Sequence, residues 1–195
     1  MRAFFAYELP EGAKAALAAL ARELRGRPDG DAVRWVRSES YHVTLRFLGN
    51  VATARLTELV EAVRAELAAA KPFAVALGAP HAFPSARRPR VVVLGLEPET
   101  QLAALVQRIE AGVVAAGLPA ETRRFHAHLT LGRLRGRRLP SLDASALETG
   151  ALEVREAVLF QSELGRDGSR YTPLARLPLA SAAACAAPLP LPTNL

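Results

Sequence analysis

The four-residue pattern His-x-Thr-Leu occurs twice in this chain, at His42–Leu45 and again at His128–Leu131. Both copies lie in runs rich in strand-forming residues, and in a β-strand the side chains of residues i and i+2 point to the same face. Each histidine therefore lies beside its threonine, and the apolar residues between them point the other way. The pattern predicts two strands, each with a core behind it and a His-Thr surface in front. Because the chain has only four histidines, chance repetition is a weak explanation.

The length of 195 residues, half of them hydrophobic, is enough for one domain or for two small lobes that share a core. Residues 1–7 form too short an apolar run for a signal peptide, and no stretch approaches the roughly 20 apolar residues of a membrane span. Cys185 is the only cysteine, which leaves neither an internal disulfide nor a cysteine-based zinc site. We expect a soluble, cytoplasmic protein with no membrane partner.

The chain carries a net charge of +6, and its basic residues are arginines apart from Lys14 and Lys71. Arginine suits two-pronged phosphate contacts, although a coding bias toward arginine accounts for the composition equally well. The positions of the arginines are more informative, because two of their three groups flank the second histidine motif. These groups suggest a polyanionic ligand near that motif. They are Arg87, Arg88 and Arg90; Arg123 and Arg124; and Arg133, Arg135, Arg137 and Arg138.

Periodicity and turn signals predict an α+β fold in which helices cover one face of antiparallel sheets and leave the other face free for a cleft. His81 is expected in an exposed loop, and Gly165–Gly168 in a hairpin turn. Residues 181–195 have no charge and no period, so we expect a disordered tail after a single domain at 1–180; a docked extended segment is the alternative. The expected helices span 13–25, 53–70 and 98–117, and the expected strands span 2–8, 33–36, 41–49, 73–77, 90–96, 124–134, 151–162 and 171–179.

Two histidines that face each other across a cleft can act as general acid and general base, since the pKa of an unperturbed imidazole lies near neutrality. A threonine hydroxyl beside each ring can donate to a phosphoryl oxygen as negative charge builds up. The combination suits attack at phosphorus, with one proton taken from the nucleophile and another given to the leaving oxygen. It requires no metal and no cofactor.

Other interpretations of these residues are weaker. Two histidines without a nearby Asp, Glu or Cys are too few ligands for a metal. A single His-x-Thr would most simply be an ordinary strand segment, but two copies make that interpretation the minority one. No Gly-x-Ser-x-Gly elbow, Walker loop or Gly-x-Gly-x-x-Gly is present, which argues against a serine nucleophile and against nucleoside triphosphates or dinucleotides.

The chain resembles the two-histidine (2H) phosphoesterase superfamily and, within it, the bacterial and archaeal RNA 2′,3′-cyclic phosphodiesterases, historically called 2′-5′ RNA ligases. The resemblance implies a bilobal fold, with pseudo-symmetric lobes whose antiparallel sheets line a central groove and whose helices lie outside. It also implies hydrolysis of a terminal 2′,3′-cyclic phosphate to a 2′-phosphate without metal or ATP. It extends over residues 1–179 and rests on 2–5, Trp35, 42–49, 83–85, 89–91, 124–133, 162–164 and 171–174.

By that resemblance His42 is the proton donor to the departing 3′ oxygen, and His128 is the proton acceptor that activates water. Thr44 and Thr130 match the hydroxyls that hold phosphate oxygens. The symmetry of the motifs leaves the reversed assignment of acid and base open. The chain departs from its relatives at Ala127, where proline is common.

Four further residues are candidates for substrate binding. Arg133 fits the family motif, but strict alternation places it on the face opposite His128 unless a bulge near Gly132 re-aims it. Arg46 has the parity to approach the groove, or is a solvated strand residue. His126 shares parity with His128, and Tyr171 is able to stack on a base; Phe125 suits that role too, although core packing is the better explanation for it.

We therefore expect a monomeric enzyme whose partners are RNA or oligonucleotide ends with a 2′,3′-cyclic phosphate. Two alternatives stay open: a non-catalytic module that binds RNA ends or nucleotides, and weak 2′-5′ ligation by the reverse reaction. tRNA halves, short oligonucleotides and cyclic nucleotides share the same reactive group, so the sequence does not choose among them.

Overall fold

The computed structural model describes residues 1–136, 138–143, 149–165 and 168–180, so the expected tail at 181–195 lies outside the described residues. The fold is mixed α and β, as the sequence predicts, and in these described ranges three short 3-10 helices supplement the main helices and strands. In chain order these are β1 (Arg2–Glu8), α1 (Glu11–Arg25), β2 (Val33–Trp35), β3 (His42–Asn50), α2 (Leu56–Leu67), β4 (Phe73–Phe83), β5 (Val91–Glu97), α3 (Glu99–Ala115), β6 (His128–Leu134), β7 (Leu152–Val154), β8 (Glu156–Gly165) and β9 (Gly168–Pro178).

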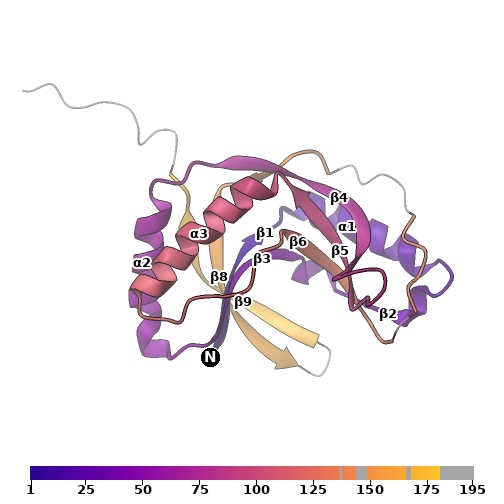
Figure 1. Ribbon diagram of the computed structural model, residues 1–195, viewed down its shortest axis with the longest axis horizontal. Coiled ribbons are helices and arrows are strands. Elements are labelled where there is room, and N and C mark those ends of the chain that lie inside the picture. The colour runs from indigo at the N-terminus through magenta and orange to yellow at the C-terminus, as the bar shows by residue number, and fades with distance from the viewer. Residues whose placement is uncertain (137, 144–148, 166–167, 181–195) are drawn as a thin grey trace, which may run out of the picture.

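The described strands form one strongly curled antiparallel sheet in the order β7-β4-β5-β6-β3-β1-β8-β9, with β2 beside the end of β6 (Figure 1). The two histidine strands, β3 and β6, lie at its centre. They pair at one point only, Val43 opposite Leu129, and then separate. This single contact joins the two halves of the sheet.

The two halves repeat the same order of elements. A strand, a helix and a histidine strand occur first as β1-α1-β3 and again as β5-α3-β6. Each half also gives a strand to the other, because β4 from the first half pairs with β5, and β8 from the second half pairs with β1. This exchange confirms the expected pair of lobes and interlocks them.

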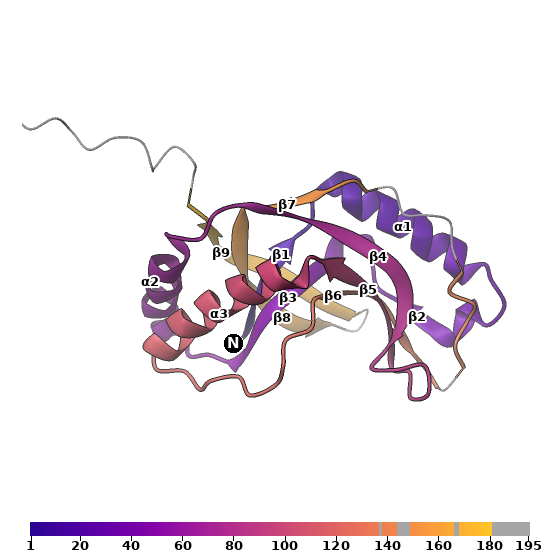
Figure 2. The same ribbon diagram turned by 45° about the horizontal axis from the view of Figure 1, so that its top comes forward.

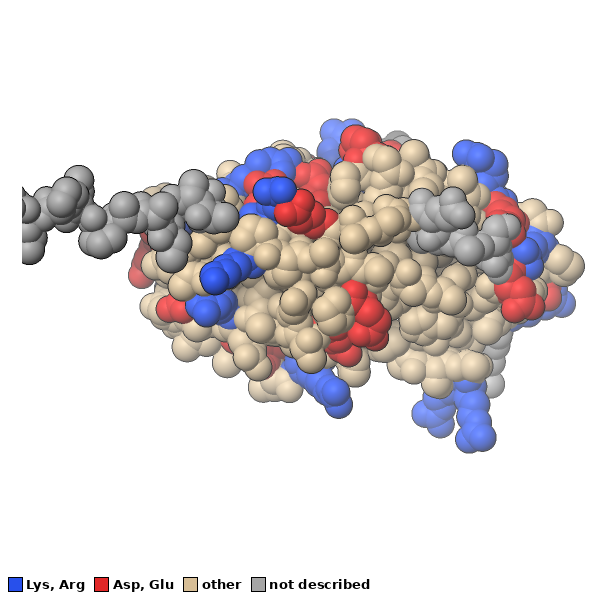
Figure 3. All heavy atoms as spheres, turned by 90° about the horizontal axis from the view of Figure 1, so that it is seen from above, with Lys and Arg blue, Asp and Glu red and all other residues tan. Residues whose placement is uncertain are grey.

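The helices lie at the two ends of the sheet, with α2 and α3 side by side at one end and α1 at the other (Figures 1 and 2). Their apolar faces cover the side of the sheet that carries Phe5, Val43 and Leu129, all fully buried. The opposite face carries the histidines. Figure 3 shows the molecule from above: acidic and basic side chains lie in small groups around a largely uncharged surface, and no patch of one sign dominates the surface seen in this view.

Several expected strand boundaries were wrong. β6 begins at His128 instead of at 124, and β9 begins at Gly168 instead of at 171. β4 continues to Phe83, so His81, which is exposed, lies in a strand and not in a loop. Pro80 suggests a break, but proline is tolerated at edge strands and bulges. Here the register shifts between Leu77 and Pro80, and β4 pairs with β7 only over 73–75. The expected hairpin at the C-terminal end is confirmed by the pairing of β8 with β9.

The contact between α2 and α3 requires glycine at position 112, and we predict that Gly112→Ala lowers the free energy of unfolding by about 1–3 kcal/mol. A methyl group there would lie 2.6 Å from the Cα of Val63. The matched control is Gly12→Ala in α1, where nothing lies within 4 Å; it should be neutral or stabilise by up to about 1 kcal/mol. Urea unfolding of both variants measures the difference, and equal stabilities would contradict the prediction.

Candidate active site

The four motif side chains come together on one face of the sheet. Because Val43 lies opposite Leu129 in an antiparallel pair, the register sets His42 opposite Thr130 and Thr44 opposite His128. The two strands separate beyond this pair, but the charge of His128 still acts on His42, so the two rings lie near each other. All four side chains are half-buried. The arrangement is a square with a histidine and a threonine on each strand, and the histidines occupy one of its diagonals.

A β-bulge follows the motif in each strand, at equivalent positions. In β3 the register passes from Thr44 opposite Ala6 to Arg46 opposite Phe5, so Leu45 is the extra residue. In β6 it passes from Thr130 opposite Val93 to Gly132 opposite Val92, so Leu131 is the extra residue. Each bulge reverses the parity of the residues that follow it.

This reversal changes the positions expected for two arginines. Arg133 shares the face of Thr130 and His128, so the expected bulge exists, one residue before Gly132. Arg46 shares the face of Phe5 instead, and the parity expected for it was wrong. Its guanidinium is buried and donates to Glu110 and to the backbone oxygens of Phe47 and Pro119. Arg46 therefore ties β3 to α3 and to the segment after it, while the exposed Phe47 faces the histidines' side.

Both imidazoles are held in the same way. Nδ1 of His42 lies 2.8 Å from the Ser40 carbonyl oxygen, and Nδ1 of His128 lies 2.8 Å from that of His126. A carbonyl only accepts, so each Nδ1 carries the proton and each neutral ring presents Nε2 as its reactive atom. The Thr44 hydroxyl, 3.1 Å from Nε2 of His42, donates to that nitrogen.

His42 lies against a small aromatic cluster. Tyr171 of β9 meets its ring edge-on with centroids 4.9 Å apart, and the Phe4 centroid is 5.0 Å away. Burial lowers the pKa of His42, although its backbone hydrogen bond opposes this; the nearby charge of His128 lowers the pKa further. Tyr171, expected to stack on a base, thus contacts and positions the histidine, and both residues line a cleft of about 80 Å³.

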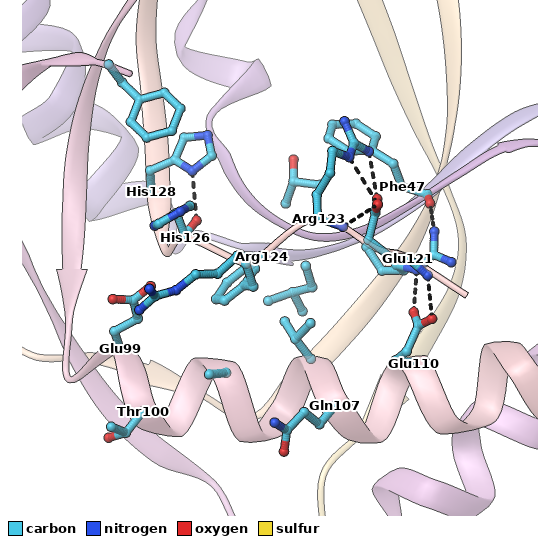
Figure 4. Close-up of a pocket in the computed structure, with 17 residues that line it drawn as sticks. Phe47, Glu99, Thr100, Gln107, Glu110, Glu121, Arg123, Arg124, His126 and His128 are labelled. Atoms are coloured by element: carbon cyan, nitrogen blue, oxygen red, sulfur yellow. Dashed lines mark hydrogen bonds and ion pairs between the residues drawn. The ribbon is translucent and has the colours of Figure 1, made fainter. Parts of the chain in front are cut away.

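His128 lies at the mouth of a larger space, the α3 hollow, of about 740 Å³ between α3, the end of β3 and the segment 121–126 (Figure 4). Phe83 stacks on the imidazole, with centroids 5.4 Å apart. His126 lines the same hollow, as its parity with His128 suggests, but it precedes β6 instead of lying in it. Arg124 extends across the hollow toward Glu99 (Figure 4). The lining of the α3 hollow also includes Thr44, Phe47, Ala103, Gln107 and Phe125.

The outer wall of the α3 hollow is anchored by carboxylates. Glu110 accepts from Arg46 and, at 2.7 Å, from the backbone N–H of Glu121. Glu121 pairs with Arg123 at 2.6 Å, and the hydrogen bonds from Arg123 lower the pKa of Glu121 to about 2. Of the expected basic groups, Arg123 therefore has an acidic partner, as does Arg138 with Asp29 at 3.2 Å. Arg137 lies outside the described residues.

Comparison with known proteins identifies the family. The sequence profile of the family described as LigT like Phosphoesterase matches residues 8–93 and again residues 94–171, in agreement with the repeat in the fold. The chain belongs to the LigT-like phosphoesterases. This confirms the resemblance to the 2H superfamily that the histidine motifs carry.

Relatives of this LigT-like chain cover most of its length. A protein of Methanothermobacter thermautotrophicus named RNA 2′,3′-cyclic phosphodiesterase is 33% identical over 179 residues, which is 88% of this chain and 95% of that protein. One of Aeropyrum pernix with the same name is 33% identical over 78% of this chain and 89% of its own length. Among solved structures, TT0787 of Thermus thermophilus matches with a TM-score of 0.79 at 28% identity, covering 93% of this chain and all of that one. Escherichia coli LigT complexed with 3′-AMP matches with a TM-score of 0.78 at 27% identity, covering 92% and 98%.

Sequence reasoning missed several neighbours of the histidines in this LigT-like fold. Phe4 and Phe83 contact the rings, and Phe47 borders the site, but strand register alone brings them there. Two features are absent from the described part of the chain: a helix long and apolar enough to cross a membrane, and a group of three or more His, Cys, Asp or Glu side chains able to hold a metal ion.

The burial of His42 predicts a component of stability that depends on pH. The pKa of His42 is lowered from 6.5 in the folded state, so below pH 6.5 the unfolded chain binds a proton that the folded chain does not. Stability should therefore fall as the pH drops through 6.5, and level off below the folded-state pKa. Urea unfolding between pH 8 and pH 5 should show this component in the native protein and in the exposed-site control His81→Gln. Its persistence in His42→Gln would contradict the assignment.

Proposed function

We propose that this protein hydrolyses the terminal 2′,3′-cyclic phosphate of RNA to a 2′-phosphate and a free 3′-hydroxyl. The observation that carries the proposal is the register at Val43 and Leu129, which sets two His-Thr pairs against each other on one surface. The relatives named RNA 2′,3′-cyclic phosphodiesterase support the same reaction. Nothing in this scheme calls for a cofactor or a metal.

The square of side chains suits in-line displacement at phosphorus. Nε2 of His128 takes a proton from a water molecule, whose oxygen forms the new bond to phosphorus. As the bond from phosphorus to the 3′ oxygen breaks, Nε2 of His42 gives its proton to that oxygen. Thr44 and Thr130 donate to the non-bridging oxygens, where negative charge builds up. Proton exchange with solvent then restores both rings.

The environment of each histidine agrees with these roles. The α3 hollow beside His128 is open and supplies water, whereas His42 lies in a cleft of only about 80 Å³. Burial keeps His42 neutral in the free enzyme, because it lowers the pKa of the ring. An anionic phosphate beside Nε2 favours the imidazolium and raises that pKa. Binding of the substrate therefore turns His42 into the acid.

Replacing either histidine tests both the reaction and the roles. His42→Asn and His128→Asn should each lower kcat by about 10²–10⁴ while the fold is kept. The profile of kcat/KM against pH should be bell-shaped in the native enzyme. The alkaline limb should disappear in His42→Asn and the acid limb in His128→Asn; the opposite pattern would reverse the roles. The substrate is a short oligoribonucleotide with a 2′,3′-cyclic phosphate, and the product is followed by chromatography.

Two controls complete this test: an assay in the presence of a chelator, and a histidine variant outside the site that is expected to keep the native rate. Activity should persist in EDTA, since both proton transfers are carried by side chains. His81→Asn, an exposed histidine outside the square, should keep the native rate. A protein that binds the oligonucleotide in a salt-sensitive way but never turns it over would instead be a non-catalytic module.

The size of the α3 hollow favours a second activity, 2′-5′ ligation, in the same site. A space of about 740 Å³ is in the range that holds small-molecule ligands, and it adjoins the position from which water attacks. A nucleoside with a free 5′-hydroxyl seated there would replace water as the nucleophile, and His128 would take its proton. Without an activated nucleotide the equilibrium yield should be low.

Filling the hollow should separate ligation from hydrolysis. Ala103→Trp places a large side chain inside it and should lower ligation at least about tenfold relative to hydrolysis, which needs only water. Ala104→Trp, one residue along α3 on its exposed side, is the matched control and should leave the ratio unchanged. An equal loss of both activities in Ala103→Trp would contradict this use of the hollow.

A further inference from the structure

Two arginines lie directly opposite each other just beyond the catalytic square. Arg34 of β2 pairs with Arg133 of β6 in an antiparallel register. Residues in such a pair point to the same face, with Cβ atoms about 4.5–5.5 Å apart. The neighbours of Arg34, Val33 and Trp35, are buried on the other side, so both arginine side chains are exposed on the histidines' side of the sheet.

This pair is unfavourable unless something neutralises it. Like charges directly opposite each other destabilise a sheet. Within the described ranges, neither guanidinium has an acidic partner within 4.0 Å or a hydrogen bond to another residue. Across β6, Arg133 lies opposite Val91, which offers no charge. Two exposed arginines held in this register are arranged to bind an anion between them.

The position of the pair relative to the square identifies that anion. Thr130 and Arg133 lie opposite Val93 and Val91 of β5, so they are two strand residues, or about 7 Å, apart along the sheet. Along the two central strands, the α3 hollow comes first, then the square, and then the arginine pair. A phosphate in the square and a second phosphate at the arginines would flank one extended nucleotide.

We propose that Arg34 and Arg133 together bind the phosphate on the 5′ side of the terminal nucleotide of RNA. The fork of each guanidinium can donate two hydrogen bonds to phosphate oxygens. This inference rests on the proposed function and narrows its substrate to RNA ends of at least two nucleotides, in preference to nucleoside cyclic phosphates. It also agrees with His42 as the acid, because the ribose that carries the leaving oxygen would lie on the side toward the arginines.

The test compares a dinucleotide and a mononucleoside, each with a 2′,3′-cyclic phosphate. Arg34→Glu should lower kcat/KM for the dinucleotide roughly ten- to hundredfold and leave the mononucleoside within about twofold. The dependence of the dinucleotide kcat/KM on salt should become shallower. Arg34→Gln should act in the same direction with a smaller effect. Arg22→Glu on the exposed face of α1 makes the same change in net charge and should leave both substrates unaffected.

A stability measurement separates binding from damage to the fold. Because Arg34→Glu puts a carboxylate opposite Arg133, its melting temperature should be equal to or higher than the native value, even as it turns over the dinucleotide more slowly. Equal losses for both substrates, or no loss for either, would overturn the proposal. If the native protein turns over neither substrate, the proposed function fails. The arginine pair is then tested by calorimetric binding of a dinucleotide with a terminal 2′-phosphate. The proposal predicts that Arg34→Glu binds this dinucleotide more weakly than the native protein does.

Discussion

The pairing of Val43 with Leu129 is the contact on which the rest of the site depends. Both side chains are fully buried, and they join the two halves of the sheet at one point. Because side chains alternate along a strand, a slip of one residue at this point would turn a histidine and its threonine into the core and expose the apolar residues between them. The hydrophobic effect thus sets the register, and the register sets the geometry of the four polar side chains. Strand separation on either side of this contact leaves room for a ligand above it.

The internal repeat produces the symmetric part of the site. Differences between the two repeats at equivalent positions make the two ends of the groove chemically unlike. After each bulge, Arg46 occupies the position equivalent to Gly132, and Phe47 the position equivalent to Arg133. Gly132 has no space for a side chain, since a methyl group there would lie 2.4 Å from Val33 of the strand β2 that packs against it. Arg46 instead has room and ties β3 to α3. One end of the groove is consequently apolar beside Phe47, and the other is basic beside Arg133.

Sequence alone predicted the parts of this structure that follow from short-range pattern. The period-two arrangement of His42 and Thr44, and of His128 and Thr130, indicated the strands and their faces, and the apolar spacing of α2 indicated its helix. The positions of Arg46 and Arg133 depend on bulges, whose presence is decided by strands β1 and β5 that are distant in sequence. The contacts of Phe4, Phe83 and Tyr171 with the histidines depend on the same long-range pairing. No local pattern carries that information.

The burial of His42 disfavours the protonated ring that a proton donor needs. The substrate phosphate reverses this effect. Desolvation disfavours the imidazolium as long as the groove holds only solvent, and the charge of His128 adds to this effect. The low local dielectric that lowers the pKa also strengthens the attraction of an anion placed beside the ring. A phosphate between the two histidines therefore shifts His42 toward its charged form by more than it would shift an exposed histidine. The aromatic cluster of Phe4 and Tyr171 thus makes protonation of the acid depend on occupancy of the site.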